Sequence, residues 1–93
     1  MKIMAYAKWN LEDWDKVSKK NNAIQEERKK FPNRYPKPLS PPYHQGTGRI
    51  FRLYEGTEEQ FANVVARWVP EMKWQLVAIF DGDDMEQALK RIK

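Results

Sequence analysis

The chain has 93 residues, of which 41% are hydrophobic and 13% aromatic, and it contains no cysteine. This length suits one domain with a single core over residues 1–93, and the apolar content argues against disorder of the whole chain. Without cysteine the chain can form no disulfide and no thiolate site. No apolar run approaches the roughly 18 residues that a membrane span needs. We therefore expect a cytoplasmic protein with no membrane partner.

The formal net charge of +4 is unevenly distributed along the sequence. Residues 1–40 hold ten Lys/Arg and five Asp/Glu, whereas residues 41–93 hold seven and eight. A basic first segment can attract nucleic acid, and this remains an alternative. A solvated lysine-rich helix face explains the charge more simply, and we do not expect nucleic acid as the partner.

The first strand is predicted over residues 2–9, where apolar and other side chains alternate. One face carries small residues that would let a helix lie close, and the other is mixed; the sets are Ile3, Ala5 and Ala7 against Met4, Tyr6 and Lys8. Asn10 then predicts an N-cap, with Asp13 at the capping-box position. A helix is expected over about residues 11–30, with an apolar stripe of Leu11, Trp14, Val17 and Ile24 and with Phe31 near its end.

Residues 31–45 contain five of the six prolines. Proline lacks a backbone N–H, so neither a helix nor an internal strand fits this segment. An irregular edge strand that ends near Tyr43 and His44 is the preferred interpretation, and a disordered linker is the alternative.

The sequence is organised around residues 46–56, which predict a turn at Gly46-Thr47-Gly48 followed by a central strand. Phe51 and Leu53 share one face of that strand at period two. The other face is mixed, with Ile50, Arg52 and Tyr54. A mixed face of this kind suits a pocket, a subunit contact or solvent.

The last third of the chain predicts helix, strand and helix. Thr57 and Gln60 form a capping box before the clearest amphipathic pattern of the chain, and Pro70 ends that helix. Residues 72–80 predict a strongly apolar strand internal to the sheet. Asp83 and Glu86 predict the cap of a short terminal helix, whose single apolar stripe is Met85, Ala88, Leu89 and Ile92.

The fold class expected from this order is α+β: a ferredoxin-like βαββαβ arrangement with a short C-terminal helix, in which two helices lie on one face of a four-stranded antiparallel sheet. The other face of the sheet would be bare, and a second copy of the chain is the simplest cover for it. Candidates for that face are Met4, Tyr6, Arg52 and Tyr54, together with one face of the last strand, either Trp74, Leu76, Ala78 and Phe80 or their alternates.

A family resemblance is carried by a succession of motifs: Tyr43-His44, the glycine turn, Gly48-Arg49-x-Phe51, Leu53-x-Glu55, a helix ending near Trp68, and a last strand followed by an acidic turn and a short helix. Over about residues 1–90, and most sharply over 43–81, the chain resembles a small family of uncharacterised proteins in the dimeric α/β-barrel superfamily. It departs from that pattern at Ala78-Ile79, where a proline is common, and in its proline-rich second strand.

The resemblance implies two ferredoxin-like subunits whose sheets face each other. It leaves function open, since such relatives include cofactor-free monooxygenases, isomerases, dehalogenating or decarboxylating enzymes, haem-binding proteins and ligand-sensing domains.

Acid–base chemistry would centre on His44, the only histidine, near the predicted turn. A neutral imidazole there could accept a proton while Arg49 or Arg52 holds an oxyanion. Glu55 is a second acid–base candidate. An exposed turn histidine, and a glutamate paired with a lysine, are the plain structural alternatives.

Aromatic side chains with a few polar groups suit a pocket for a flat ligand. Trp14 and Trp68 fall on helix stripes and are expected in the core, whereas the ligand-binding candidates are Tyr6, Trp9, Tyr43, Tyr54 and Glu55, with Trp74 considered beside them. One histidine and no cysteine disfavour a zinc or iron site, so no metal or cofactor is expected. The expected function is therefore homodimeric binding of a small apolar or aromatic molecule, with cofactor-free acid–base or monooxygenase-like catalysis left open. The alternatives are a purely structural dimer and a nucleic-acid binder that uses the basic first helix.

Overall fold

The computed structural model describes residues 1–92 as an α+β fold with three α-helices and an open antiparallel sheet of five strands. The strands are β1 (Lys2–Lys8), β2 (Lys37–Pro38), β3 (Tyr43–His44), β4 (Arg49–Glu55) and β5 (Lys73–Ala78). The helices are α1 (Trp14–Lys30), α2 (Glu58–Trp68) and α3 (Gly82–Ile92), and short 3-10 turns cover Leu11–Asp13 and Pro32–Arg34.

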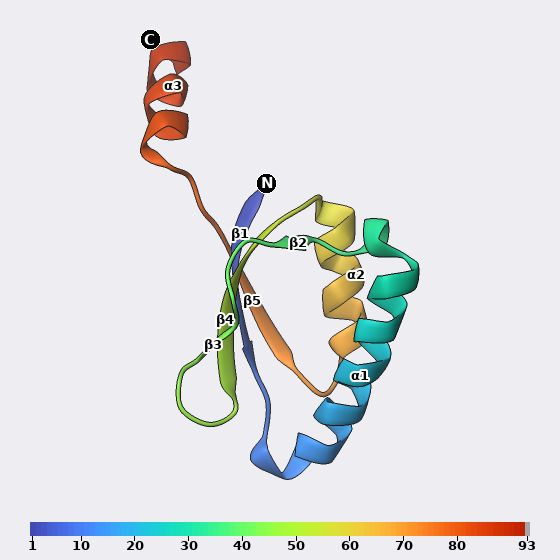
Figure 1. Ribbon diagram of the computed structural model, residues 1–93. Coiled ribbons are helices and arrows are strands. Elements are labelled where there is room, and N and C mark those ends of the chain that lie inside the picture. Colours follow the sequence, from blue (N-terminus) through green and yellow to red (C-terminus); the bar gives the residue numbers. More distant parts are fainter. Residues whose placement is uncertain (93) are drawn as a thin grey trace.

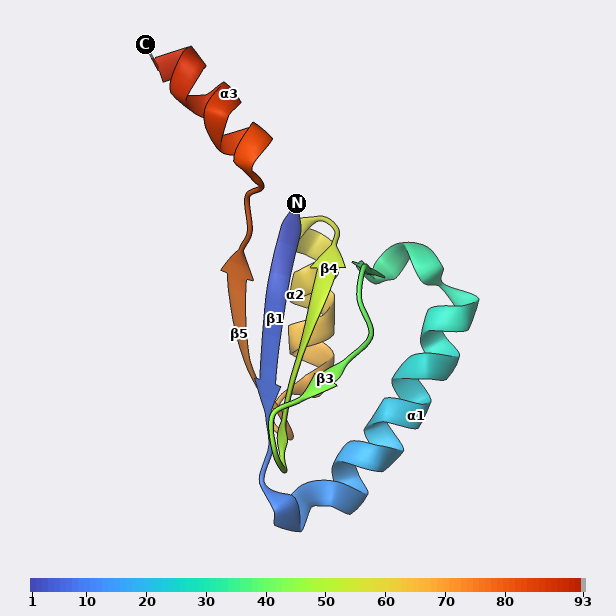
Figure 2. The same ribbon diagram turned by 60° about the vertical axis from the view of Figure 1, so that its left-hand side comes forward.

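The strand order is β2-β4-β1-β5, and β3 pairs with the same strand, β4, as β2 does. Figure 1 shows α1 and α2 together on one side of the sheet. In Figure 2, the turned view, α3 again stands beyond the end of β5 and away from the other two helices. The molecule therefore has a two-layer body with one helix outside it.

The register of the central strands assigns each side chain to a face. Ile3, Ala5 and Ala7 of β1 are buried, as expected for the side on which helices pack, and we call this side the helix face. The opposite side, which we call the open face, carries the alternate residues of β1, β4 and β5. Its residues are Met4, Tyr6 and Lys8 of β1, Arg49, Phe51 and Leu53 of β4, and Lys73, Gln75 and Val77 of β5.

This register corrects the predicted bare face. Arg52 pairs with Ala5 and Tyr54 with Ile3, so both lie on the helix face. The apolar pair Phe51 and Leu53 lies on the open face instead, where both side chains are half-buried. The sequence left open which face of the last strand is turned inward. The register with β1 places Trp74, Leu76 and Ala78 on the helix face.

The proline-rich segment forms two two-residue strands, so the sheet has five strands and not the predicted four. Pro41 and Pro42 carry no N–H and interrupt the ladder between them. Ser40 partly replaces the missing bonds, because its hydroxyl accepts the Leu53 N–H at 3.0 Å. The segment is ordered along β4 and is not the linker considered as its alternative.

The last strand, β5, lies at the edge of the sheet and not inside it, because within residues 1–92 it pairs with β1 alone. The prediction of an internal strand was wrong because the residues on both faces of this strand are largely apolar. One parity faces the helices, and the other, including Val77, is exposed on the open face.

Of the three predicted helix N-caps, one is confirmed and two are wrong. The capping box of Thr57 and Gln60 is present at α2. Asn10 makes no side-chain cap bond, and a 3-10 turn precedes α1. At α3 it is Asp81, not Asp83, whose carboxylate accepts an N–H, that of Asp84, at 2.8 Å.

The core lies between the helix face and the two packed helices. Its buried cluster comprises Ala7, Val17, Ile24, Tyr35, Trp68 and Met72. Trp68 was expected there and is buried. Trp14 was also expected in the core but is 54% exposed.

The turn before β4 has both glycines at positive φ, 70° at Gly46 and 79° at Gly48, as predicted. They differ in their surroundings. A Cβ at Gly48 would lie 2.7 Å from the Trp9 carbonyl oxygen, whereas one at Gly46 would meet nothing within 4 Å. The close approach fixes the turn against the end of β1, where the Trp9 N–H donates to the Gly48 carbonyl at 2.9 Å.

We therefore expect Gly48→Ala to destabilise the protein more than Gly46→Ala. Gly46→Ala introduces only the left-handed strain of an L residue, on the order of 1–2 kcal/mol, while Gly48→Ala adds a backbone collision. Urea unfolding followed by far-UV circular dichroism measures both losses. Equal losses for the two variants would contradict the close approach.

Candidate functional site

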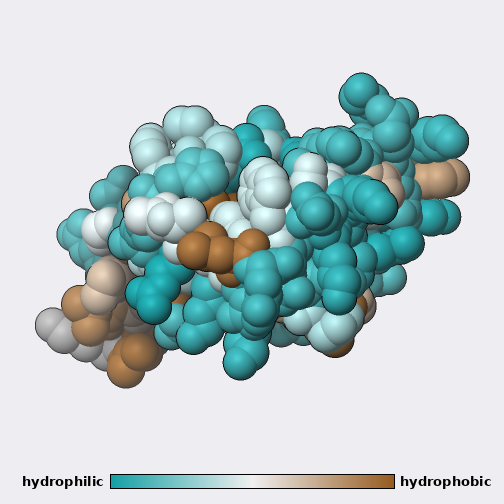
Figure 3. Space-filling view, turned by 90° about the horizontal axis from the view of Figure 1, so that it is seen from below, coloured by the Kyte–Doolittle hydropathy of each residue, from teal (hydrophilic) through white to brown (hydrophobic). Residues whose placement is uncertain are grey.

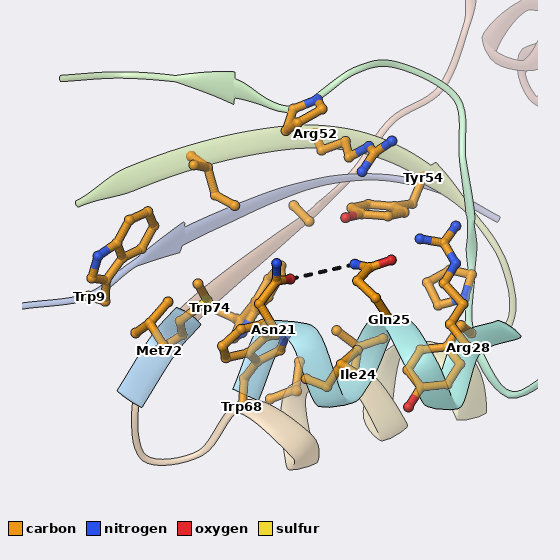
Figure 4. Close-up of a pocket in the computed structure, with 18 of the residues that line it drawn as sticks. Trp9, Asn21, Ile24, Gln25, Arg28, Arg52, Tyr54, Trp68, Met72 and Trp74 are labelled. Carbon is orange, nitrogen blue, oxygen red and sulfur yellow. Dashed lines mark hydrogen bonds between the residues drawn. The ribbon is translucent and has the colours of Figure 1, made fainter. Parts of the chain in front are cut away.

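A cavity of about 390 Å³ lies between the helix face of the sheet and helices α1 and α2. Figure 4 shows side chains converging on it from strands above and helices below. Most of its wall is aromatic or aliphatic, and the principal side chains are Trp9, Trp14, Ile24, Ile50, Tyr54, Phe61, Trp68, Met72 and Trp74. A mostly apolar hollow with a few polar groups is the usual form of a small-molecule site.

The polar part of the wall comes from α1 and from β3 and β4. Asn21, Gln25 and Arg28 recur at helical spacing, so they share one side of α1 beside the buried stripe. Gln25 donates from Nε2 to Asn21 Oδ1 at 3.5 Å, the contact drawn in Figure 4. On the opposite wall stand Arg52 and His44.

Arg52 is held in place by its own strand and the neighbouring segment. Its Nε donates to the Ser40 carbonyl at 2.7 Å, and its guanidinium carbon lies 5.7 Å from the centre of the Tyr54 ring. Figure 4 shows the guanidinium group beside Tyr54, whose ring lies between β4 and Gln25. The two remaining guanidinium nitrogens form no hydrogen bond to residues 1–92, so they can donate to a bound anion.

Two indole groups of the wall are unsatisfied. Nε1 of Trp9 and Nε1 of Trp74 are buried and have no hydrogen-bond partner among the described residues. A buried donor without an acceptor costs about 1–3 kcal/mol. Both nitrogens are closed off from the cavity as well as from solvent, so a bound molecule reaches them only if a side chain of the wall moves.

The structure brings only part of the predicted site together. Of the predicted residues, Trp9, His44, Arg52 and Tyr54 line the cavity. Arg49 lies on the open face, because three positions separate it from Arg52 and odd spacings on a strand change face. The predicted group of His44, Arg49 and Arg52 is therefore split between the two faces.

The remaining predicted residues lie elsewhere. Tyr6 and Tyr43 stack on the Phe51 ring of the open face, with centroid distances of 5.9 and 5.2 Å. Glu55 is exposed at the end of β4, opposite Lys2 and Lys37. The sequence prediction missed Asn21, Gln25 and Arg28, although their spacing of four and three residues is visible in the sequence.

Ion pairs hold α1 over the cavity. Lys20 bonds the Glu71 carboxylate, and its Nζ also lies 3.4 Å from the Val69 carbonyl oxygen, so α1 is joined to the connection between α2 and β5. That hydrogen bond from Lys20 holds the pKa of Glu71 below its ordinary value. At the other end of α1, Glu27 pairs with Arg67 at 2.6 Å. Burial, and next the charge of Glu27, raise the pKa of Tyr35.

No group of three or more potential metal-ligating side chains occurs among residues 1–92. Within the same residues, no helix combines the length and apolarity of a membrane span. No protein-family model, curated protein sequence or solved structure matches the chain. The chemistry of the site is therefore argued from its own residues.

Loss of the Lys20–Glu71 pair should be visible in the pH dependence of stability. Because the folded-state pKa of Glu71 lies below the ordinary 4.5, its contribution to the free energy of unfolding is present above pH 4.5 and is lost as the pH falls through the folded-state pKa. We expect Glu71→Gln to lower the urea midpoint at pH 7 and to converge with the wild type at the acid end of a titration from pH 7 to 3.

Glu12→Gln is the matched control, since Glu12 is exposed and joins no ion pair among the described residues. It should follow the wild type throughout. If the Glu71→Gln and wild-type midpoints stay equally separated over the whole pH range, the pair does not hold α1.

Proposed function

We propose that the chain is a ferredoxin-like subunit of a homodimeric α/β barrel that binds a small, flat apolar or aromatic molecule carrying an acidic group. The observation that carries the ligand proposal is the helix-face cavity, in which a mostly aromatic and aliphatic wall surrounds Arg52. The flat shape follows from the aromatic wall, and the acidic group from the free guanidinium donors.

The strand order supports the ferredoxin-like part of the proposal. β1 lies between β4 and β5, antiparallel to both, and β2 and β3 extend the sheet on the far side of β4. Counting β2 and β3 as one strand broken by prolines gives the βαββαβ order, with both crossover helices on one face. The exposed apolar and aromatic side chains of the open face, Tyr6, Tyr43 and Val77, support the dimer.

A ligand acid would be bound by charge and by shape together. Arg52 can make two charge-assisted hydrogen bonds to a carboxylate, and Arg28 lines the same cavity from the α1 side. Tyr54, Trp68 and Trp74 then offer surfaces for the ring system. The apolar body of the ligand would replace water in contact with these aromatic side chains.

Catalysis is the second candidate function, and the observation that favours it is that His44 and Arg52 line the same cavity. In that case His44 would exchange a proton with the bound molecule while Arg52 steadies its anionic form. Arg49, on the open face, takes no part. Binding requires fewer assumptions, and we place it first.

Binding is tested with 2-naphthoate, a flat aromatic acid, and with 2-naphthamide, its uncharged analogue. We expect 2-naphthoate to change the tryptophan fluorescence with a stoichiometry of one per chain. Arg52→Gln should weaken 2-naphthoate binding by about 10–100-fold, the loss of charge-assisted hydrogen bonds, and should weaken 2-naphthamide much less.

Arg49→Gln is the matched control, because it removes the same charge from the opposite face of the same strand. Its affinity for 2-naphthoate should equal that of the wild type. The ligand proposal is overturned if neither probe binds, or if both arginine variants lose affinity equally. Native mass spectrometry with no bound mass and an intact dimer would favour the structural alternative.

A further inference from the structure

The helix α3 has an apolar stripe that no other segment of residues 1–92 covers. Met85, Leu89 and Ile92 recur at helical spacing and are 58%, 60% and 83% exposed. In Figure 3, hydrophobic side chains gather at one extremity of the molecule, whereas most of the visible face is hydrophilic. An isolated helix of 11 residues is marginal in water, so this stripe needs a partner surface.

The start of α3 is fixed in a direction that leads away from the body. The Ile79 N–H donates to the Lys2 carbonyl at 3.0 Å, and Lys2 Nζ lies 3.8 Å from Asp81. The Asp81 carboxylate also accepts the Asp84 N–H. The connection between β5 and α3 therefore continues the line of β5, as Figures 1 and 2 both show.

The opposite end of the sheet carries a basic group on the open face. Lys8 pairs with Arg49 on one side and with Lys73 on the other, so the three cations are neighbours, and none of them joins an ion pair among the described residues. An exposed apolar side chain, Leu11, follows β1 at the same end. We call these four residues the basic end.

We propose that a second copy of this chain covers these surfaces by reciprocal exchange of α3. The inference rests on the homodimer proposed above and adds its geometry. A two-fold axis that lies between the two sheets and runs perpendicular to the strands brings the two open faces together. The strands of the two copies are then antiparallel. The end from which α3 leaves one copy then lies over the basic end of the other, and its stripe packs against Leu11 there.

Charge selects the second copy over a fold-back within one chain. In the exchanged arrangement the acidic first turn of α3, with Asp83 and Asp84, meets the basic end of the partner copy. If α3 instead folded back over its own open face, its last turn, with Lys90 and Arg91, would approach its own basic end and be repelled. Only the exchange pairs opposite charges.

The test uses the charge-reversal variants Asp83→Lys and Lys73→Glu, with the dimer dissociation constant measured by analytical ultracentrifugation. Each variant alone places like charges together at two symmetric positions and should weaken the dimer about tenfold. An equimolar mixture of the two should regain wild-type affinity as a heterodimer. In that heterodimer the two introduced charges, which are opposite in sign, face each other across one contact, and the native Asp83 and Lys73 face each other across the second. Such rescue between chains is impossible for a fold-back.

The apolar contact is tested with Leu89→Glu, which we expect to weaken the dimer about 100-fold. The control is Gln87→Glu, which adds the same charge on the opposite side of α3 and should leave the dimer dissociation constant unchanged. A dimer indifferent to all α3 variants overturns the exchange and leaves the sheet-to-sheet dimer standing. A monomeric wild-type protein overturns both the exchange and the sheet-to-sheet dimer. If that monomer binds oligo(dT) through Phe51, the open face is assigned to single-stranded nucleic acid. Binding of 2-naphthoate is scored separately and is unaffected by either failure.

Discussion

The antiparallel register of β1 with its two neighbours is the constraint on which the rest of the structure depends. It sets Ala5 between Arg52 and Leu76, and Ala7 between Ile50 and Trp74. Methyl side chains on the central strand leave room beneath the helices that larger residues would fill. Of the two alanines, Ala5 lines the cavity, between the longer side chains of Arg52 and Leu76. A shift by one residue would turn Met4 and Tyr6 into this space and remove it.

The same register separates two kinds of surface. The helix face holds Arg52, Tyr54 and the tryptophans around a partly open cavity. The open face holds a row of stacked rings, Tyr43, Phe51 and Tyr6, with cations at one end. The proposed ligand site and the proposed dimer interface therefore lie on opposite sides of one layer. A variant on one face can leave the other intact, and Arg49 and Arg52 differ for this reason despite their closeness in sequence.

Local structure was largely readable from the sequence because its causes are local. The positive φ of the turn glycines and the capping box of α2 depend on residues within a few positions of one another, and both predictions are confirmed. The periodicity of β1 also predicted correctly which of its faces is buried.

The errors arose where long-range pairing decides. Both faces of β5 are apolar, so its sequence looks internal although it lies at an edge. The place of Arg52 depended on which face of β4 the helices cover, which no local pattern states. The separation of Arg49 from Arg52 was nevertheless predictable from their spacing alone, as was the shared side of Asn21, Gln25 and Arg28.

The small core gives the proposed ligand and the proposed second copy the same physical role. Among residues 1–92 only nine hydrophobic side chains are buried, and none is fully enclosed. A domain of this length has little apolar burial to set against its conformational entropy. Molecules that bind only the folded state stabilise it, and the stabilisation grows with the logarithm of their concentration relative to the dissociation constant. A ligand in the helix-face cavity and a partner on the open face would each add burial where the single chain lacks it. The unfilled space under α1 and the uncovered stripe of α3 then have one physical meaning, as surfaces that the chain alone leaves incomplete.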